Sequence, residues 1–127
     1  MIIGERPGRR ARASGQDEFL TAAELNADIG LYNAATSNAV SSGIHSKDAI
    51  CLRRTGTSTK ADNHGEALAE LRRSGPEGRA LESTLKRLLS LKTRAQYQVV
   101  DVAATDAQRA VRWARSMLDI ATEVVRS

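Results

Sequence analysis

Three polar side chains with reactive chemistry interrupt apolar helical faces in this sequence: Asp48, His64 and Lys92. Asp48 shares a stripe with Ile44, and Lys92 lies about 20° from Leu81 around its helix, in the middle of a leucine stripe. A lone buried carboxylate or ammonium is costly, so each charge needs a partner. We therefore expect Asp48 to pair with Lys92, with His64 in the same polar pocket.

His64 is expected to open a helix, where the helix dipole disfavours a charged imidazole. A neutral imidazole there could serve as a base or a hydrogen-bond acceptor near physiological pH. A purely structural interpretation stays open, because Lys92 can extend to solvent along its apolar stem. Asp48 and Lys92 could equally form a buried ion pair that fixes helix register.

A second group of interest is basic. Arg109, Arg112 and Arg115 follow one another at intervals of three residues, with Trp113 among them. Such a face could bind phosphates while the indole stacks on a base. A solvated charged face, with Trp113 in an interface, is the interpretation that these residues favour.

The elements that must position these residues are helices. Residues 56–62 form a polar loop, Gly56 is expected to cap the preceding helix, and capping boxes are expected at Asn63 and at Thr105. Residues 97–104 are either an extended link or a continuation of the fourth helix. Apolar residues recur at helical spacing in five segments: 17–28, 31–55, 64–73, 77–96 and a last one after Thr105.

Length and composition fit this arrangement. The chain has 127 residues, 41% of them hydrophobic and only 3% aromatic, which suits one core of Ala, Leu, Ile and Val between closely packed helices. We predict an all-α, up-and-down bundle of four to five helices. The segment 31–55 should be the longest, and it should form the core with the fourth and fifth helices.

The charge of the chain divides it into two parts. The net charge is +4, but residues 1–15 carry four arginines against one glutamate, so the remainder is nearly neutral. We expect a basic, disordered tail over residues 1–15 and a single domain over residues 16–127. Contact of the tail with phosphates is the alternative.

Cysteine and histidine usage limits the chemistry further. The single Cys51 permits no internal disulfide and fits a reducing cytoplasm. Two histidines and one cysteine far apart give no metal-ligand spacing, so we expect no metal and no cofactor. No apolar run approaches the length of a membrane span, and no secretory signal is expected.

The order of four segments resembles the HEPN superfamily, particularly small bacterial HEPN-like proteins. The resemblance covers roughly residues 17–125. The segments are Ser-Gly-Ile-His-Ser-Lys-Asp-Ala-Ile-Cys at 42–51, Asp-Asn-His at 62–64, Leu-Leu-Ser-Leu-Lys-Thr-Arg-Ala-Gln-Tyr at 88–97 and Asp-Ala-Gln-Arg-Ala at 106–110.

The resemblance implies a helical bundle that is often dimeric. Many members are toxins that cleave RNA without metal and pair with a small nucleotidyltransferase as antitoxin, while others bind nucleotides or act as scaffolds. The resemblance also implies a homodimer here, for which the small-residue face of 31–55 and Trp113 offer surfaces. It assigns four residues to the functional cleft: Asp48, His64, Lys92 and Tyr97. The expected contacts to RNA are Arg54, Lys60, Arg94, Arg109 and Arg112.

One departure from the family pattern bears on activity. Ribonuclease members carry an arginine followed after four to six residues by a histidine, and neither histidine here has that arginine. If the chain cleaves RNA, His64 would act as general acid or base, and Lys92 or an arginine would stabilise the phosphorane charge. The sequence leaves three functions open: a toxin acting on RNA, a catalytically silent module that binds a partner protein or nucleotide, and a helical interaction protein without a site.

Overall fold

A computed structural model describes residues 7–59, 63–97 and 101–127, with side chains over 18–59, 63–93 and 101–127. These residues form helices and no strand, as an all-α HEPN-like bundle requires. The five helices are α1 (Pro7–Asp28), α2 (Tyr32–Thr55), α3 (His64–Arg72), α4 (Pro76–Tyr97) and α5 (Ala104–Arg126). With 24 residues, α2 is the longest of them.

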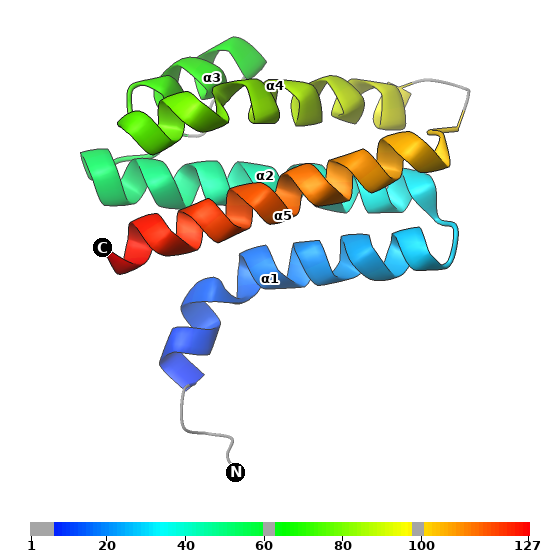
Figure 1. The fold of residues 1–127 in the computed structure, drawn as a ribbon, viewed down its shortest axis with the longest axis horizontal. Helices are drawn as coiled ribbons and strands as arrows, with labels where there is room; N and C mark the ends of the chain where they lie inside the picture. Colours follow the sequence, from blue (N-terminus) through cyan, green and yellow to red (C-terminus); the bar gives the residue numbers. More distant parts are fainter. Residues whose placement is uncertain (1–6, 60–62, 98–100) are drawn as a thin grey trace.

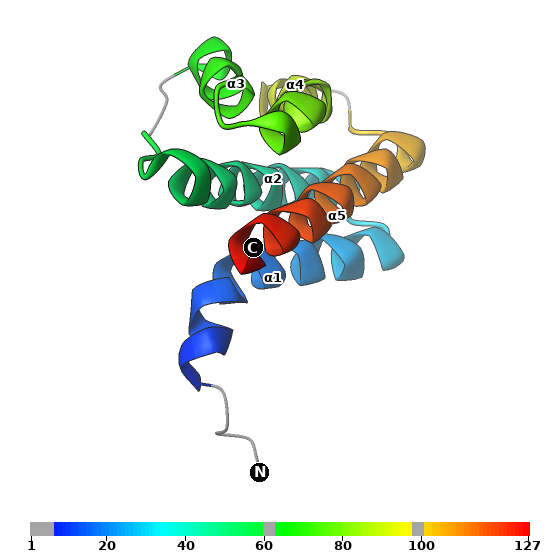
Figure 2. The same ribbon diagram turned by 60° about the vertical axis from the view of Figure 1, so that its left-hand side comes forward.

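The helices pack in layers around α2. In Figure 1, α2 and α5 lie side by side between α4 above and α1 below, and successive long helices run in opposite directions. The view from the end in Figure 2 shows α3 beside α4, on the side of the bundle away from α1. The predicted core of α2, α4 and α5 is therefore present, and α1 completes it through Leu20 and Ala23.

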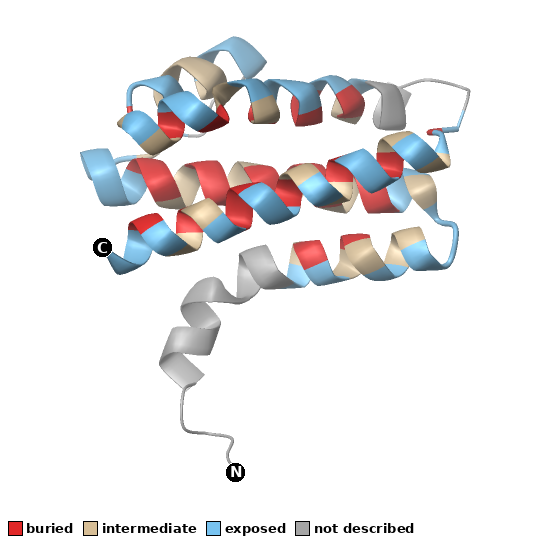
Figure 3. Cartoon of the chain, viewed as in Figure 1, coloured by how far each residue is buried: buried red, intermediate tan, exposed pale blue. Residues whose placement is uncertain are grey.

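The small residues of α2 are used inside the bundle. Figure 3 shows α2 buried along most of its length. A Cβ added at Gly43 would lie 2.7 Å from Leu88 Cδ1 of α4, so glycine is what allows this close approach. The face expected to offer a dimer surface is thus covered by α1, α4 and α5. Its buried members are Ala35, Thr36, Ala39, Ser42, Gly43 and Ser46.

Two of the predicted helix ends are confirmed by their hydrogen bonds. Gly56, with φ +81°, donates its backbone N–H to the Leu52 carbonyl and caps α2 in the left-handed conformation. At the start of α3, the Asn63 side chain accepts the Glu66 backbone N–H at 2.8 Å and donates to the Glu66 carboxylate at 2.7 Å. This is the expected capping box with asparagine as the cap.

Two other boundaries differ from the predictions. Helix α1 begins at Pro7, ahead of the expected start at Asp17, and proline is favoured in a first turn. Residues 1–6 of the expected tail lie outside the described part. Helix α5 begins at Ala104 after Ala103, which makes no side-chain cap, so the capping box expected at Thr105 is wrong. In the parts described, no helix has the length and apolarity needed to cross a membrane.

Candidate functional site

The most buried charge in the described residues is one that the sequence analysis did not single out. Lys47 of α2 is 2% exposed. Its ammonium group donates to Asp48 Oδ1 at 3.1 Å, to Ser58 Oγ and the Thr59 carbonyl at 3.4 Å each, and to Glu70 Oε1 of α3. One lysine therefore joins α2, the following loop and α3. We call these five residues the Lys47 network.

The carboxylates of the Lys47 network also bind the loop. Ser58 Oγ donates to Asp48 Oδ1 at 2.6 Å. The second oxygen of Glu70 accepts the Thr59 backbone N–H at 3.0 Å and the Thr59 hydroxyl at 3.1 Å. A buried ammonium is tolerated only when its donors are satisfied, and here they are.

The electrostatics of the network hold both charges in place. Burial lowers the pKa of Lys47, but the hydrogen bonds and opposite charges of Glu70 and Asp48 outweigh it and leave that pKa above its ordinary 10.5. Burial likewise raises the pKa of Glu70, yet its bonds to Lys47 and Thr59 prevail and hold that pKa below 4.5. The lysine is therefore charged at neutral pH, and so is the glutamate.

A protonated Lys47 limits the chemistry of its neighbours. Ser58 lies beside a lysine and a carboxylate, which are residue types found around nucleophilic hydroxyls. An ammonium cannot remove the serine proton, so Ser58 is not activated by Lys47. Burial raises the pKa of Cys51, whose thiol approaches the Glu70 carbonyl at 3.8 Å. The lysine of this arrangement anchors the loop through Ser58 and Thr59.

The expected pairing of Asp48 with Lys92 is wrong, because Asp48 pairs with Lys47. Helix α4 runs antiparallel to α2, and Leu88 packs at Gly43. Asp48 lies beyond Gly43 in one direction, and Lys92 lies beyond Leu88 in the other. At 1.5 Å rise per residue, the two positions are about 13 Å apart along the bundle. Lys92 is half-buried and has no ion pair among the described residues.

The two histidines lie apart from the Lys47 network. His64 is the first residue of α3, as predicted, but it is exposed and makes no hydrogen bond to Asp48 or Lys92 in the described residues. The ring of His45 packs edge-on against Phe19, with centroids 4.9 Å apart, and so joins α2 to α1. The side chains of Tyr97, Arg94 and Lys60 lie outside the described part of the chain. The catalytic roles expected of Asp48, His64, Lys92 and Tyr97 stay predictions.

Lys47 and Glu70 were missed for different reasons. Lys47 continues the helical spacing of Val40, Gly43 and Ile50, which are buried residues of α2. Had this stripe been taken as core, Lys47 would have stood out as a charge within it. Glu70 carries no comparable signal, because an acidic residue on a short amphipathic helix is ordinary. Its role depends on how the loop folds back to α3.

The arginines of α5 divide between two sides of the helix. Arg115 pairs with Glu24 of α1 at 3.0 Å. Arg109 approaches Asp106 of its own helix at 3.8 Å, and Arg112 is exposed. At about 100° per residue, Arg109 and Arg112 lie about 60° apart around the helix, and Arg109 and Arg115 lie about 120° apart.

Trp113 lies on the α4 side of α5. It is half-buried, packs against the main core and has the Arg87 guanidinium 6.0 Å from its ring centroid. The arginine next to Trp113 is therefore Arg87 of α4, which the sequence did not associate with it.

Residues 14–124 match the family model described as the HEPN domain. The chain belongs to the HEPN family. The match spans most of the chain and all five helices, so it agrees with the resemblance in the order of segments. A comparison with curated proteins found no match.

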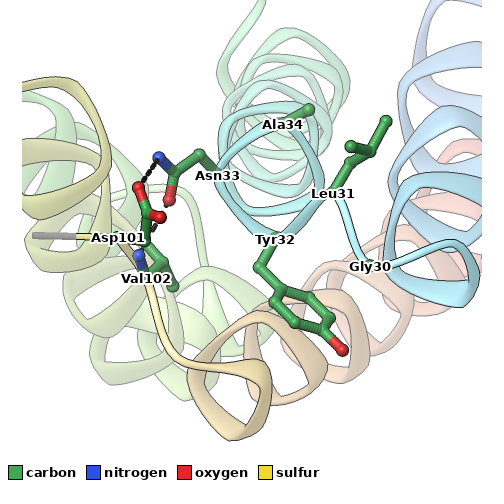
Figure 4. A pocket seen from close by; sticks show the side chains of 7 residues that line it. All are labelled: Gly30, Leu31, Tyr32, Asn33, Ala34, Asp101 and Val102. Carbon is green, nitrogen blue, oxygen red and sulfur yellow. Dashed lines mark hydrogen bonds between the residues drawn. The ribbon is translucent and has the colours of Figure 1, made fainter.

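The HEPN domain also has a pocket of about 360 Å³ at the corner where α1 turns into α2. Figure 4 shows Asn33 joining the two sides of this pocket. Its amide nitrogen donates to Asp101 Oδ1 at 3.3 Å, and its oxygen accepts the Val102 backbone N–H at 2.8 Å. The lining is otherwise mostly apolar, so the polar groups present clamp the link between α4 and α5 to α2. The lining residues are Gly30, Leu31, Tyr32, Asn33, Ala34, Asp101 and Val102.

Proposed function

We propose that this HEPN domain binds RNA without cleaving it. The observation that carries the proposal is the Lys47 network. Asp48, the carboxylate expected in a catalytic cleft, already accepts hydrogen bonds from Lys47 and Ser58. A general base must be free to reach the proton that it abstracts. His64 lies outside this network and forms no ion pair with a carboxylate among the described residues.

RNA is the ligand class that two observations favour. HEPN domains are generally associated with RNA and with toxin–antitoxin systems. The surface of α5 carries exposed arginines, and phosphate contacts by arginine supply most of the affinity of non-specific nucleic-acid binding. This proposal unites the first two functions that the sequence left open, because a silent module can still bind nucleic acid.

Binding and cleavage are separated by incubating the purified protein with total RNA and with tRNA. We expect shifted RNA on a native gel at low salt and unchanged RNA on a denaturing gel. A His64→Ala variant should bind as the wild type does. New RNA fragments that the wild type produces and His64→Ala does not would contradict this proposal.

The second candidate is a metal-independent ribonuclease, the toxin half of a pair with a nucleotidyltransferase-type antitoxin. The exposed imidazole of His64 favours it, since RNA could reach that ring. His64 would take the proton of a 2′-hydroxyl or deliver one to the leaving oxygen, and Lys92 would stabilise the charge of the phosphorane. Growth arrest on expression, abolished by His64→Ala, is the outcome expected of this candidate.

We further propose a homodimer that forms through the α1–α2 corner. Leu25, Ile29 and Leu31 are 60%, 70% and 51% exposed, and Leu31 also lines the pocket of about 360 Å³. Grouped exposed aliphatic side chains are typical of interaction surfaces. Sedimentation equilibrium at tens of micromolar should give a dimer, and Ile29→Glu should give a monomer. A wild-type monomer under these conditions would count against the dimer.

A further inference from the structure

The seam between α4 and α5 contains a tryptophan beside arginines from both helices. We define the α4–α5 seam by four residues: Arg87, Arg109, Arg112 and Trp113. Arg87 of α4 lies over the ring of Trp113, and Arg109 precedes Trp113 by one turn of α5, about 6 Å along its axis. The three arginines are exposed, while Trp113 is anchored in the core by its buried edge.

The arginines of the seam have fewer close carboxylates than three other arginines of the chain. Arg54, Arg72 and Arg115 reach glutamates at 3.0 to 3.2 Å. Within the described residues, Arg87 and Arg112 form no ion pair. Arg109 forms one ion pair among the described residues, with Asp106 at 3.8 Å, which is too long for a good charge-assisted hydrogen bond. The seam thus retains positive charge beside the ring of Trp113.

We propose that the α4–α5 seam binds single-stranded RNA, with a base stacked at the Arg87–Trp113 pair and phosphates at Arg109 and Arg112. This inference rests on the RNA-binding function proposed above and locates it. A base can stack on an aromatic ring or on a guanidinium plane, and the Arg87–Trp113 pair offers both. Stacking is possible only for a base outside a duplex, so the seam selects single strands.

Trp113 is the one tryptophan in the chain, so its fluorescence reports on the seam alone. Titration of the full chain with a uridine 12-mer at low salt should quench this emission as a base stacks on the indole. A duplex of the same length should bind more weakly and quench less. Equal quenching by the duplex would overturn the selection of single strands.

Variants test each part of the seam. Arg87→Ala and Arg109→Ala should each weaken binding of the 12-mer about tenfold. Arg109→Ala, which removes a phosphate contact, should also reduce the slope of log affinity against log salt by about 0.7. Trp113→Leu keeps an apolar group against the core and should weaken binding by a similar factor. Circular dichroism checks that each variant is folded. Arg115→Ala is the matched control, because that arginine pairs with Glu24 on the far side of α5.

The outcomes separate this surface from the function itself. If the wild type binds no RNA at low salt, the RNA-binding proposal fails and this inference fails with it. If the wild type and all seam variants bind the 12-mer equally, RNA binding stands and the seam is excluded. If a partner protein binds the seam instead, RNA will not quench the emission of Trp113, and Arg87→Ala will not change the affinity for RNA.

Discussion

The Lys47 network and the α4–α5 seam use charged side chains in opposite ways. In the network, a lysine that is 2% exposed is surrounded by acceptors from α2, the following loop and α3. In the seam, exposed arginines lie beside an aromatic ring and have few carboxylates near them. The first region contains the residue types that suggest catalysis, and the second contains those that suggest an ordinary solvated surface.

The two regions differ in whether their charged side chains already have hydrogen-bond partners within the chain. A charge whose hydrogen bonds are all satisfied within the chain holds structure together, because breaking those bonds costs more than an external ligand returns. A charge without a close partner remains free to meet one from outside. The sequence predicts where charges lie along a helix, but not which of them are already paired.

The largest expected effect is on stability and follows loss of Lys47. Lys47→Ala leaves the partly buried carboxylates of Asp48 and Glu70 without their cation, which should lower the free energy of unfolding by about 3–5 kcal/mol. Urea denaturation at pH 7 measures this. Lys86→Ala, an exposed lysine of α4, is the control and should change stability by no more than about 0.5 kcal/mol. Equal effects of the two variants would mean that the Lys47 network contributes nothing.

The next effect is a pH dependence that comes from Glu70. Its pKa in the folded chain lies below the ordinary 4.5, so its contribution to stability is present above pH 4.5 and is lost as the pH falls through the folded value. Glu70→Gln should cost about 1.5–3 kcal/mol at pH 7 and progressively less on acidification.

Urea denaturation between pH 7 and pH 3 should therefore show the curves of wild type and Glu70→Gln converging. Glu82→Gln provides the comparison, because Glu82 pairs with an exposed arginine at 3.2 Å on the surface. Parallel curves for wild type and Glu70→Gln would show that the carboxylate of Glu70 is not held ionised by its neighbours.

A smaller effect on stability shows whether the Lys47 network depends on the charges of its side chains or on their size. In Lys47→Met combined with Glu70→Leu, the buried pair is replaced by apolar groups of similar size. We expect this double variant to be more stable than Lys47→Ala, since a buried ion pair can be exchanged for hydrophobic groups at little net cost. Thermal denaturation of the two proteins tests the order. A double variant less stable than Lys47→Ala would indicate that loop anchoring by Thr59 depends on charge.

The smallest effect is expected on the side of α5 away from the seam. Arg115 and Glu24 form a surface ion pair, and such pairs contribute about 0–1 kcal/mol. Arg115→Ala should leave both the melting temperature and the affinity for single-stranded RNA nearly unchanged. A loss of RNA affinity as large as that in Arg109→Ala would place the binding surface on the side of α5 that carries Arg115, and not at the seam.

The fold was largely predictable because its signals are local. Gly56 and Asn63 determine their helix ends through bonds within a few residues, and the leucine stripe of α4 repeats at helical spacing. Thr105 failed as a cap because α5 begins two residues earlier, where the Ala103 carbonyl accepts the Ala107 N–H at 3.0 Å. Side-chain patterns do not reveal such backbone extensions.

The site was less predictable. The cost of burying a charge shows that the charge needs a partner, but it does not show which residue that partner is. Asp48 needed a cation, and the chain has four lysines, among them Lys47 and Lys92. The adjacent residue in sequence, Lys47, satisfies it, while Lys92 lies on another helix about 13 Å further along the bundle. The relative position of α2 and α4 along the bundle keeps Lys92 away from Asp48. That position depends on the contact of Gly43 with Leu88.

The partners of Lys47 also have a consequence for the order of folding. All of them lie between Asp48 and Glu70, so the sequence separations of these contacts are short. A chain emerging from the ribosome holds every group of the network before α4 and α5 have been made. Contacts of low sequence separation form early, at small cost in loop-closure entropy. The hairpin of α2 and α3 can therefore be fixed in place while the core that will cover it is still being synthesised.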